Sequence, residues 1–250
     1  MLILAIETAT SVESLALVTE GRTLAEVSFD NGLAHSPRLM KNVDYLFKTA
    51  GLAISGISAV AVSSGPGSFT GLRVGFSLAK GLAYAAKKPF LTIPTLDAFA
   101  FSVCRLNAGV TVKKTVNNRR NAYCPVIDAR KNEFYFSAYM ENISTLVKLR
   151  EESALPAAEM LKALKTLKAA KYYFFGDGIS KCAGEITNSI ANAVFLEAAP
   201  RASAIGALAL LKLKGGDLQD FNKALPFYVR KPDAIINKEE KKSKEFKCRK

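Results

Sequence analysis

The sequence contains a single histidine, no tryptophan, and four cysteines that stand far apart. His35 alone cannot supply the imidazoles of a catalytic zinc site, and the cysteines form no CxxC pair that would hold a structural zinc ion. Scattered cysteines also argue against a disulfide framework, so we expect reduced thiols in a cytoplasmic protein. Any metal ion would have to be held by oxygen ligands, and no metal site is predicted.

Long apolar runs are also missing. The opening run, Met1 to Ile6, lacks a basic start and meets Glu7, which is typical of a buried strand rather than of a signal peptide. The apolar stretch from Ala202 to Leu211 is far shorter than the roughly 20 residues that a bilayer crossing needs. We therefore expect no membrane span.

The net charge of +13 is concentrated in two segments. Residues 230–250 hold nine Lys and Arg against four Asp and Glu, and residues 111–121 hold four cations and no acid. Solvated, flexible segments are the commoner outcome of such charge runs, and RNA contact is the alternative. The candidate RNA contacts are Lys113, Lys114, Arg119 and Arg120.

Two segments share one pattern, an apolar run that ends in a carboxylate and is followed by a tight turn and a second strand. The first copy runs from Leu2 to Glu7 and continues in strands at 14–18 and 23–29. The second copy runs from Cys124 to Asp128 and continues in a strand at 133–140. Repetition of this unit predicts two lobes around a cleft.

Helices and short strands alternate between and after these copies. Ser36 and Pro37 suit a helix start and Gly51 a helix end, so we expect an amphipathic helix from Pro37 to Ala50. The other expected elements are helices at 70–86, 96–106, 157–168, 180–188 and 203–214, and strands at 59–62, 90–93, 172–175 and 194–196. This alternation predicts an α/β protein with mixed, helix-covered sheets.

A glycine-rich loop made of Gly65, Pro66, Gly67 and Ser68 joins the strand at 59–62 to the helix at 70–86. Backbone N–H groups at a helix N-terminus can hold phosphate, so this loop is a candidate phosphate or nucleotide site. It lacks the Gly-Lys-Ser/Thr of a Walker A loop. A structural strand-to-helix turn is the alternative, because glycines most often serve backbone geometry.

The helix at 70–86 has a nearly smooth face, since small residues recur at every fourth position. This face is predicted either to pack on the chain's own sheet or to meet a partner protein together with the helix at 37–50. The candidate partner-interface residues are Leu39, Met40, Val43, Leu46, Phe47, Gly71, Val74, Gly75, Leu78 and Ala79.

Glu7 and Asp128 close equivalent strands, and we expect both carboxylates to point into the cleft. Two such acids suit magnesium binding or acid–base work, but they are weak evidence without a nucleophile or further ligands. His35 precedes a helix, where a surface or capping role is commoner than a catalytic one. No catalytic residue is predicted.

Four segments carry a resemblance to a known family. They are Ile3 to Thr10, Ser64 to Gly75, Ile127 to Arg130 and Pro226 to Arg230, in this order over nearly the whole chain. On these segments the sequence resembles the TsaB (YeaZ) family of threonylcarbamoyl tRNA modification. The resemblance implies the actin-like ATPase (ASKHA) fold, an α/β architecture of two ribonuclease-H-like lobes, which agrees with the duplicated β-meander.

The expected lobes span residues 1–107 and 108–237, followed by a basic disordered tail at 238–250. The resemblance also implies a subunit that is not an enzyme and that forms a heterodimer with TsaD. Together with TsaE, the pair modifies the adenosine next to the anticodon in tRNAs that read ANN codons. A homodimer is expected when TsaD is absent.

No cofactor is expected on this chain alone, and ATP and a metal ion are expected in the partner complex. The catalytic sister of the family uses an HxxxH motif, whose counterpart here ends in Leu39 instead of a second histidine. The chain departs from the family in Glu7, where aspartate is usual, and in its longer basic segment and tail, which leave open an added tRNA contact. The alternative function is a stand-alone nucleotide hydrolase or a glycoprotease-like (peptidase M22) enzyme.

Overall fold

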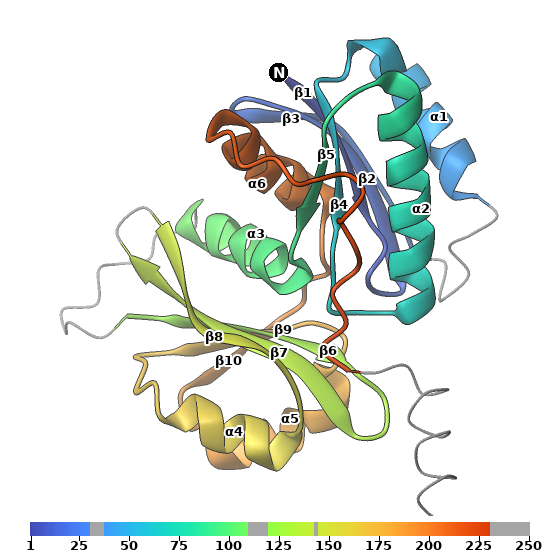
Figure 1. The fold of residues 1–250 in the computed structure, drawn as a ribbon. Coiled ribbons are helices and arrows are strands. Elements are labelled where there is room, and N and C mark those ends of the chain that lie inside the picture. The colour runs from blue at the N-terminus through green and yellow to red at the C-terminus, as the bar shows by residue number, and fades with distance from the viewer. Residues whose placement is uncertain (31–37, 110–119, 143–144, 231–250) are drawn as a thin grey trace, which may run out of the picture.

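The computed structural model describes residues 1–30, 38–109, 120–142 and 145–230, which form two α/β lobes stacked one above the other (Figure 1). The strands are β1 (Leu2–Glu7), β2 (Val12–Thr19), β3 (Arg22–Asp30), β4 (Ala59–Ser63), β5 (Phe90–Ile93), β6 (Ala122–Asp128), β7 (Glu133–Asn142), β8 (Thr145–Pro156), β9 (Tyr172–Phe175) and β10 (Ala193–Leu196). The helices are α1 (Leu39–Ala50), α2 (Phe69–Ala86), α3 (Thr95–Gly109), α4 (Ala157–Lys165), α5 (Ile179–Ser189) and α6 (Ala202–Lys214), with a 3-10 turn at Ile54–Gly56. Within these ranges no helix combines the length and apolar character that a membrane crossing requires.

The first lobe is built on a five-stranded sheet in the order β3-β2-β1-β4-β5. β1, β2 and β3 form an antiparallel meander, whereas β4 and β5 extend the sheet in parallel to β1. β1 lies at the centre of this sheet and is buried from Ile3 to Glu7. A strand covered on both faces needs apolar residues at successive positions, which explains its continuous apolar run.

Helices cover both faces of the first sheet (Figure 1). α1 and α2 pack on the face that carries Leu4 and Ile6. α6 packs on the opposite face, where Ala5 and Val18 meet Gly206. A Cβ on Gly206 would come within 2.8 Å of the Cβ of Val18, so glycine permits this close approach.

The second lobe repeats the topology of the first. Its sheet has the order β10-β9-β6-β7-β8, in which β6, β7 and β8 form the antiparallel meander and β9 and β10 run parallel to β6. α4 and α5 cover one face of this sheet. The predicted duplication and the two-lobed α/β fold are therefore confirmed.

α3 lies between the lobes and packs on both of them (Figure 1). Ala98 belongs to the core of the first lobe. The Phe99 ring meets the ring of Phe175 in β9 edge-on, with 4.7 Å between centroids. The Tyr139 hydroxyl of β7 donates a hydrogen bond to the Asp97 carboxylate over 2.7 Å. One helix thus joins the cores of the two lobes.

The structure differs from the sequence-based expectation in two elements. β8 was not predicted, because an edge strand that carries Arg150, Glu151 and Glu152 has no apolar run. α6 was expected within the second lobe at 108–237 but packs on the first sheet, because its small residues fit the alanine-rich face there. The Pro37 helix start and the tail at 238–250 lie outside the described residues.

Candidate functional site

A cleft of about 260 Å³ lies between the lobes. The β1–β2 turn and the start of α2 line it from the first lobe, and the end of β6, Tyr135 and Asp177 line it from the second. Tyr228 and Arg230, near the end of the described chain, complete its wall. The lobes are therefore arranged around a shared cleft, as the duplication predicts.

Asp128 is the acidic end of β6, and it lines this cleft. Its Oδ2 atom lies 2.6 Å from the Lys181 ammonium, and its Oδ1 atom accepts a hydrogen bond from the Arg130 N–H over 2.9 Å. Burial of the carboxyl opposes ionisation, but Lys181 and the Arg130 N–H outweigh it and hold the pKa of Asp128 below its ordinary value.

Asp177 lies beside Asp128, and its pKa is shifted in the opposite direction. Its Oδ1 atom accepts a hydrogen bond from the Asp128 N–H over 3.1 Å. Burial, reinforced by the charge of Asp128, raises the pKa of Asp177 above its ordinary value. The second lobe thus supplies two neighbouring carboxyls whose pKa values are moved apart, an arrangement that also occurs in acid–base sites.

Glu7 does not line the cleft, and the prediction that its carboxylate points into the cleft is wrong. Its side chain is fully buried, and its Oε1 atom accepts a hydrogen bond from the Ala9 N–H over 2.6 Å. The carboxylate holds the β1–β2 turn from inside the lobe. In the described ranges no three His, Cys, Asp or Glu side chains cluster as metal ligands would.

The glycine-rich loop connects β4 to α2 and is held in place by hydrogen bonds within the first lobe. Gly65 has φ +108°, and a Cβ there would strike the Phe227 carbonyl oxygen. Its N–H donates to the Thr95 hydroxyl over 3.1 Å, while the Ser68 N–H donates to the Ala9 carbonyl over 2.7 Å. Pro66 has no N–H, so among the four loop residues only the Gly67 amide lies outside these two bonds. These contacts favour the structural alternative, since a phosphate cradle needs several convergent N–H groups.

A segment at 217–230 runs from the end of α6 across the first lobe to the second (Figure 1). The Phe227 N–H donates to the Ser64 carbonyl over 2.7 Å, and the Tyr228 ring lies 5.0 Å from the ring of Phe69. Arg230 donates to the Ala129 carbonyl of the second lobe over 2.7 Å. This cross-lobe strap, residues 217–230, was not foreseen from the sequence.

Seven of the ten predicted partner-interface residues are buried in the chain's own core. They are Leu39, Val43, Leu46, Phe47, Gly71, Gly75 and Ala79. A Cβ on Gly75 would strike the hydroxyl of Thr8, the residue that follows β1, so the small-residue face of α2 packs on the first lobe's own core. These seven residues are therefore not accessible to a partner, and their prediction as interface residues is wrong. Met40, with 53% of its surface exposed, and the half-buried Val74 and Leu78 remain accessible.

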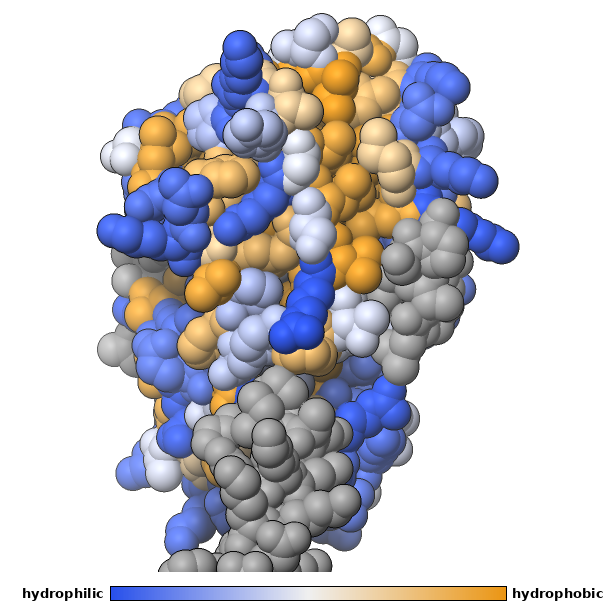
Figure 2. Space-filling model, turned by 45° about the vertical axis from the view of Figure 1, so that its right-hand side comes forward, coloured by the Kyte–Doolittle hydropathy of each residue, from blue (hydrophilic) through white to orange (hydrophobic). Residues whose placement is uncertain are grey.

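The outer face of α2, defined by Val74, Ser77, Leu78, Gly81 and Ala85, carries no charge over three turns. Figure 2 shows an apolar stripe on this side of the first lobe, bordered by hydrophilic side chains. A contiguous apolar stripe with a polar rim is typical of a protein-docking surface. Helical periodicity places these five residues away from the small residues that face the sheet. The sequence could therefore have identified this face if the small residues had been assigned to the sheet.

The predicted RNA contacts fall mostly outside the described residues. Lys113, Lys114 and Arg119 are not described, and neither is His35. Arg120 is exposed beside the start of β6, and its carbonyl accepts a hydrogen bond from the Ala170 N–H over 3.1 Å. Its contact with RNA stays a prediction.

Two ribonuclease-H-like lobes around a central cleft define the class: an α/β protein with the actin-like ATPase fold. The family model for "TsaD: tRNA N6-adenosine threonylcarbamoyltransferase" matches residues 31–238. The chain therefore belongs to this family, and within it to the TsaB (YeaZ) branch that its relatives represent.

These relatives are "tRNA threonylcarbamoyladenosine biosynthesis protein TsaB" of two bacteria. The Escherichia coli protein is 30% identical over 71% of this chain and 72% of its own length. The match to the Haemophilus influenzae protein is 36% identical over 54% of this chain and spans about half, 52%, of that protein. The solved structure of YeaZ from Pseudomonas aeruginosa superposes with TM-score 0.71 and 26% identity over 91% of this chain and 99% of its own. Family membership places the chain in threonylcarbamoyladenosine biosynthesis.

Proposed function

We propose that this chain is a non-catalytic partner subunit of tRNA threonylcarbamoylation. It pairs with TsaD through the outer face of α2 and acts with TsaE on the adenosine next to the anticodon of tRNAs that read ANN codons. ATP and a metal ion serve the chemistry in the partner complex, and the chain forms a homodimer when TsaD is absent. Membership in a family that includes both TsaB relatives and the TsaD model supports this pairing.

The uncharged outer face of α2 is the observation that carries the proposal. Leu78 and Val74 lie half-exposed on it, and Gly81 allows a partner helix to approach because nothing lies within 4 Å of the position of its missing Cβ. Burying such a face costs no charge desolvation and removes apolar surface from water. A helix of the partner fits this requirement.

The contacts of Asp128 in the second lobe support an accessory role. The Asp128 carboxylate is held by Lys181 and by the Arg130 N–H, and Arg230 of the cross-lobe strap is bound to the Ala129 carbonyl beside it. A carboxylate that already has a cation partner has less capacity to coordinate a metal ion.

Two helical glycines offer a matched test. Gly81 on α2 and Gly184 on α5 are both exposed, and at neither does any atom lie within 4 Å of the position that a Cβ would take. Gly81→Arg should weaken co-purification with TsaD by about ten-fold or more, because it places a charge in an apolar contact, whereas Gly184→Arg should leave it unchanged.

The rate of tRNA modification by TsaD and TsaE is then measured with wild type, with each variant and with no added chain. Gly81→Arg should lower this rate, and Gly184→Arg should leave it unchanged. Equal loss of pairing in both variants, or full pairing by Gly81→Arg, would contradict the assignment of this face. Gly75→Arg is unsuitable for this test, since Gly75 lies against Thr8 and the substitution would disrupt the fold.

A stand-alone nucleotide hydrolase is the second candidate, favoured by the two carboxyls in the cleft. Asp128 and Asp177 with displaced pKa values could serve acid–base chemistry on a bound nucleotide. Measuring ATP hydrolysis by the purified chain separates the candidates. Turnover that Asp177→Asn abolishes would favour the hydrolase, and absence of turnover in wild type would favour the accessory subunit.

A further inference from the structure

The parallel strands of the second sheet begin at the end of the sheet that lies away from the cleft between the lobes. β6, β9 and β10 run in parallel, and Ala122 and Ala193 are both paired with Tyr172. Asp128, at the end of β6, lines the cleft, so the strand starts lie at the other end of the sheet. Neither the proposed TsaD contact nor the cleft chemistry uses this end.

Four exposed cations gather at these strand starts. We call them the basic patch, and they are Arg120, Lys165, Lys168 and Lys171. The Ala170 N–H donates to the Arg120 carbonyl over 3.1 Å, and the Ala122 N–H donates to the Lys171 carbonyl over 2.9 Å. These bonds hold the residues before β6 against the residues before β9. Lys165 and Lys168 line one hollow of about 300 Å³ at the same place.

The cations of the basic patch have no ion-pair partner among the described residues. The segments 120–123, 161–173 and 189–194, which form this end of the sheet, contain no Asp or Glu. Glu141 reaches the same end from β7, but it lies beside Cys104 of α3, where burial and the Glu141 charge raise the pKa of the thiol. The patch therefore carries a positive charge that suits an anionic ligand.

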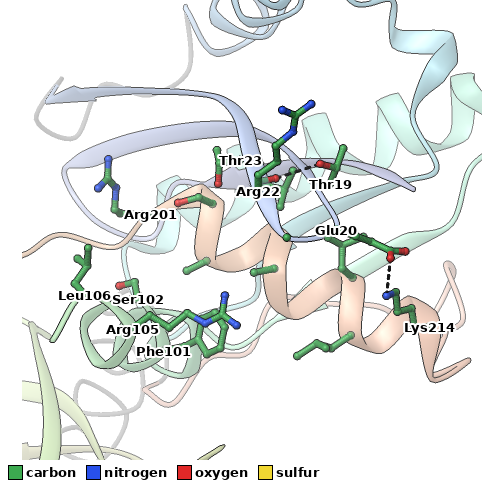
Figure 3. Close-up of a pocket in the computed structure, with 17 residues that line it drawn as sticks. Thr19, Glu20, Arg22, Thr23, Phe101, Ser102, Arg105, Leu106, Arg201 and Lys214 are labelled. Atoms are coloured by element: carbon green, nitrogen blue, oxygen red, sulfur yellow. Dashed lines mark hydrogen bonds and ion pairs between the residues drawn. The ribbon is translucent and has the colours of Figure 1, made fainter. Parts of the chain in front are cut away.

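The cations around the larger cavity beside α6, of about 410 Å³, give a contrast (Figure 3). Lys214 is paired there with Glu20 over 2.9 Å, and Arg201 is paired with Glu26 over 3.2 Å. The chain itself thus neutralises part of the charge at that cavity. In the basic patch no acid of the described chain does so, and the charge is available to a ligand.

Helix geometry accounts for only one of the four cations. Lys165 is the last residue of α4, where a positive charge offsets the helix dipole. Lys168, Lys171 and Arg120 lie outside helices and strands, so the dipole does not explain them. Like charges that gather on one surface repel one another, and a bound polyanion would offset this repulsion.

The hollow at the basic patch favours a ribose–phosphate chain as the ligand. Asn192 lines it, and its Nδ2 atom donates to the Ala169 and Ala170 carbonyls over 3.0 and 2.8 Å. The Oδ1 atom is left to accept a hydrogen bond, which a ribose 2′-hydroxyl can donate. The large apolar residues that line the hollow, Tyr172 and Ile190, are buried, so an amphipathic protein segment would find little apolar contact there.

We propose that the basic patch binds the sugar–phosphate backbone of RNA, with its cations on the phosphates and Asn192 on a ribose 2′-hydroxyl. The proposal rests on the proposed function, because the RNA is the tRNA that the complex modifies. The second lobe thereby contacts the tRNA, while the outer face of α2 in the first lobe contacts TsaD. Residues 110–119 lie outside the described residues and are not part of the patch.

Fluorescence anisotropy with a labelled tRNA that reads an ANN codon tests the patch on the purified chain alone. The basic-patch variant combines Arg120→Gln, Lys165→Gln, Lys168→Gln and Lys171→Gln. It should weaken binding by about ten-fold or more at low salt and lower the slope of log affinity against log salt concentration by about 2 to 4 units. All four side chains are exposed, so the variant should keep the circular dichroism spectrum and melting temperature of wild type.

A control variant removes the same charges from the first lobe. It combines Arg38→Gln, Lys41→Gln, Lys87→Gln and Lys88→Gln, whose side chains likewise have no ion-pair partner among the described residues. Lys87 and Lys168 also share a left-handed backbone, with φ 52° and 49°, so the two variants match in this respect. The control should bind tRNA within about three-fold of wild type.

DNA of the same sequence tests the ribose contact. Wild type should bind this DNA about three-fold or more weakly than the tRNA, because DNA has no 2′-hydroxyl for Asn192. The basic-patch variant should lose the preference, since it no longer holds the backbone against the hollow.

Three outcomes would overturn the proposal. They are equal loss of tRNA binding in the basic-patch and control variants, equal binding of tRNA and DNA by wild type, and undetectable binding of tRNA. Tighter binding of polyglutamate than of tRNA, lost in the basic-patch variant, would also overturn it and identify an acidic protein as the ligand. Gly81→Arg should leave tRNA binding by the chain alone unchanged, so failure of the patch and failure of the TsaD contact are measured separately.

Discussion

The two lobes share one strand order, yet equivalent carboxylates have different surroundings in them. Glu7 and Asp128 each end the first strand of a meander. Glu7 is sealed inside the first lobe and holds the Ala9 N–H, whereas Asp128 borders the cleft and meets Lys181. Duplication has therefore preserved topology but not chemistry. In one copy the acid is part of the framework, and in the other it remains at the surface where lobes and ligands can meet.

The largest expected effect tests whether the lobes are independent. Phe136 is fully buried in the second lobe, and Phe136→Ala should lower the free energy of unfolding by about 3–5 kcal/mol. Because α3 joins both cores, the first lobe should lose stability in the same transition. Hydrogen exchange of β1 and β6 amides, measured with urea unfolding, checks this. Loss of protection in β6 alone would show that the lobes unfold separately.

A smaller effect should separate the two acids. Glu7→Ala leaves the buried Ala9 N–H without its acceptor, and we expect a loss of roughly 2 kcal/mol in the free energy of unfolding. Asp128→Ala removes a partly exposed ion pair and should cost less than about 1 kcal/mol. Urea denaturation of both variants gives the comparison. Equal costs would mean that Asp128 is as much a part of the framework as Glu7.

The smallest effect concerns pH. The pKa of Asp128 is lowered in the folded protein, so its contribution to stability is present above the ordinary aspartate pKa, about 4, and is lost as pH falls through the lowered value. Asp177, with a raised pKa, has the opposite sign and disfavours folding as pH rises through the ordinary range.

Lys181→Met removes the cation and should raise the pKa of Asp128, which carboxyl carbon NMR titration measures. Lys165→Met, at the exposed end of α4, is the matched control and should leave the titration in place. A pKa of Asp128 that stays unchanged in Lys181→Met would assign the shift to the Arg130 N–H instead.

Much of this architecture follows from local patterns. The buried run of β1 and its repeat in β6 predict both sheets, and the amphipathic spacing of α1 predicts a helix. Local patterns could not show that Gly75 faces Thr8 rather than a partner, because either neighbour accepts a small residue. Local patterns therefore located the helices, but they did not show that seven of the ten expected interface residues are buried in the chain's own core.

Features built from distant segments could not be predicted at all. The cross-lobe strap joins Tyr228 to Phe69 and Arg230 to the second lobe. The cavity of about 410 Å³ beside α6 is lined by the β2–β3 turn, by Arg105 on α3 and by Lys214 on α6. Each side chain is ordinary on its own segment, and only the return of α6 to the first sheet brings them together.

Because α6 packs on the first sheet, the first lobe can be completed only after α6 has been synthesised. The strands of the second sheet and the helices α4 and α5 are made before α6. On the face of the first sheet that carries Ala5 and Val18, α3 covers only a part, and the rest stays open until α6 is made. Domains fold as units while the ribosome extends the chain. The lobe that begins the sequence is therefore the last to close, and until α6 is made its open alanine-rich face is a place where a chaperone could bind.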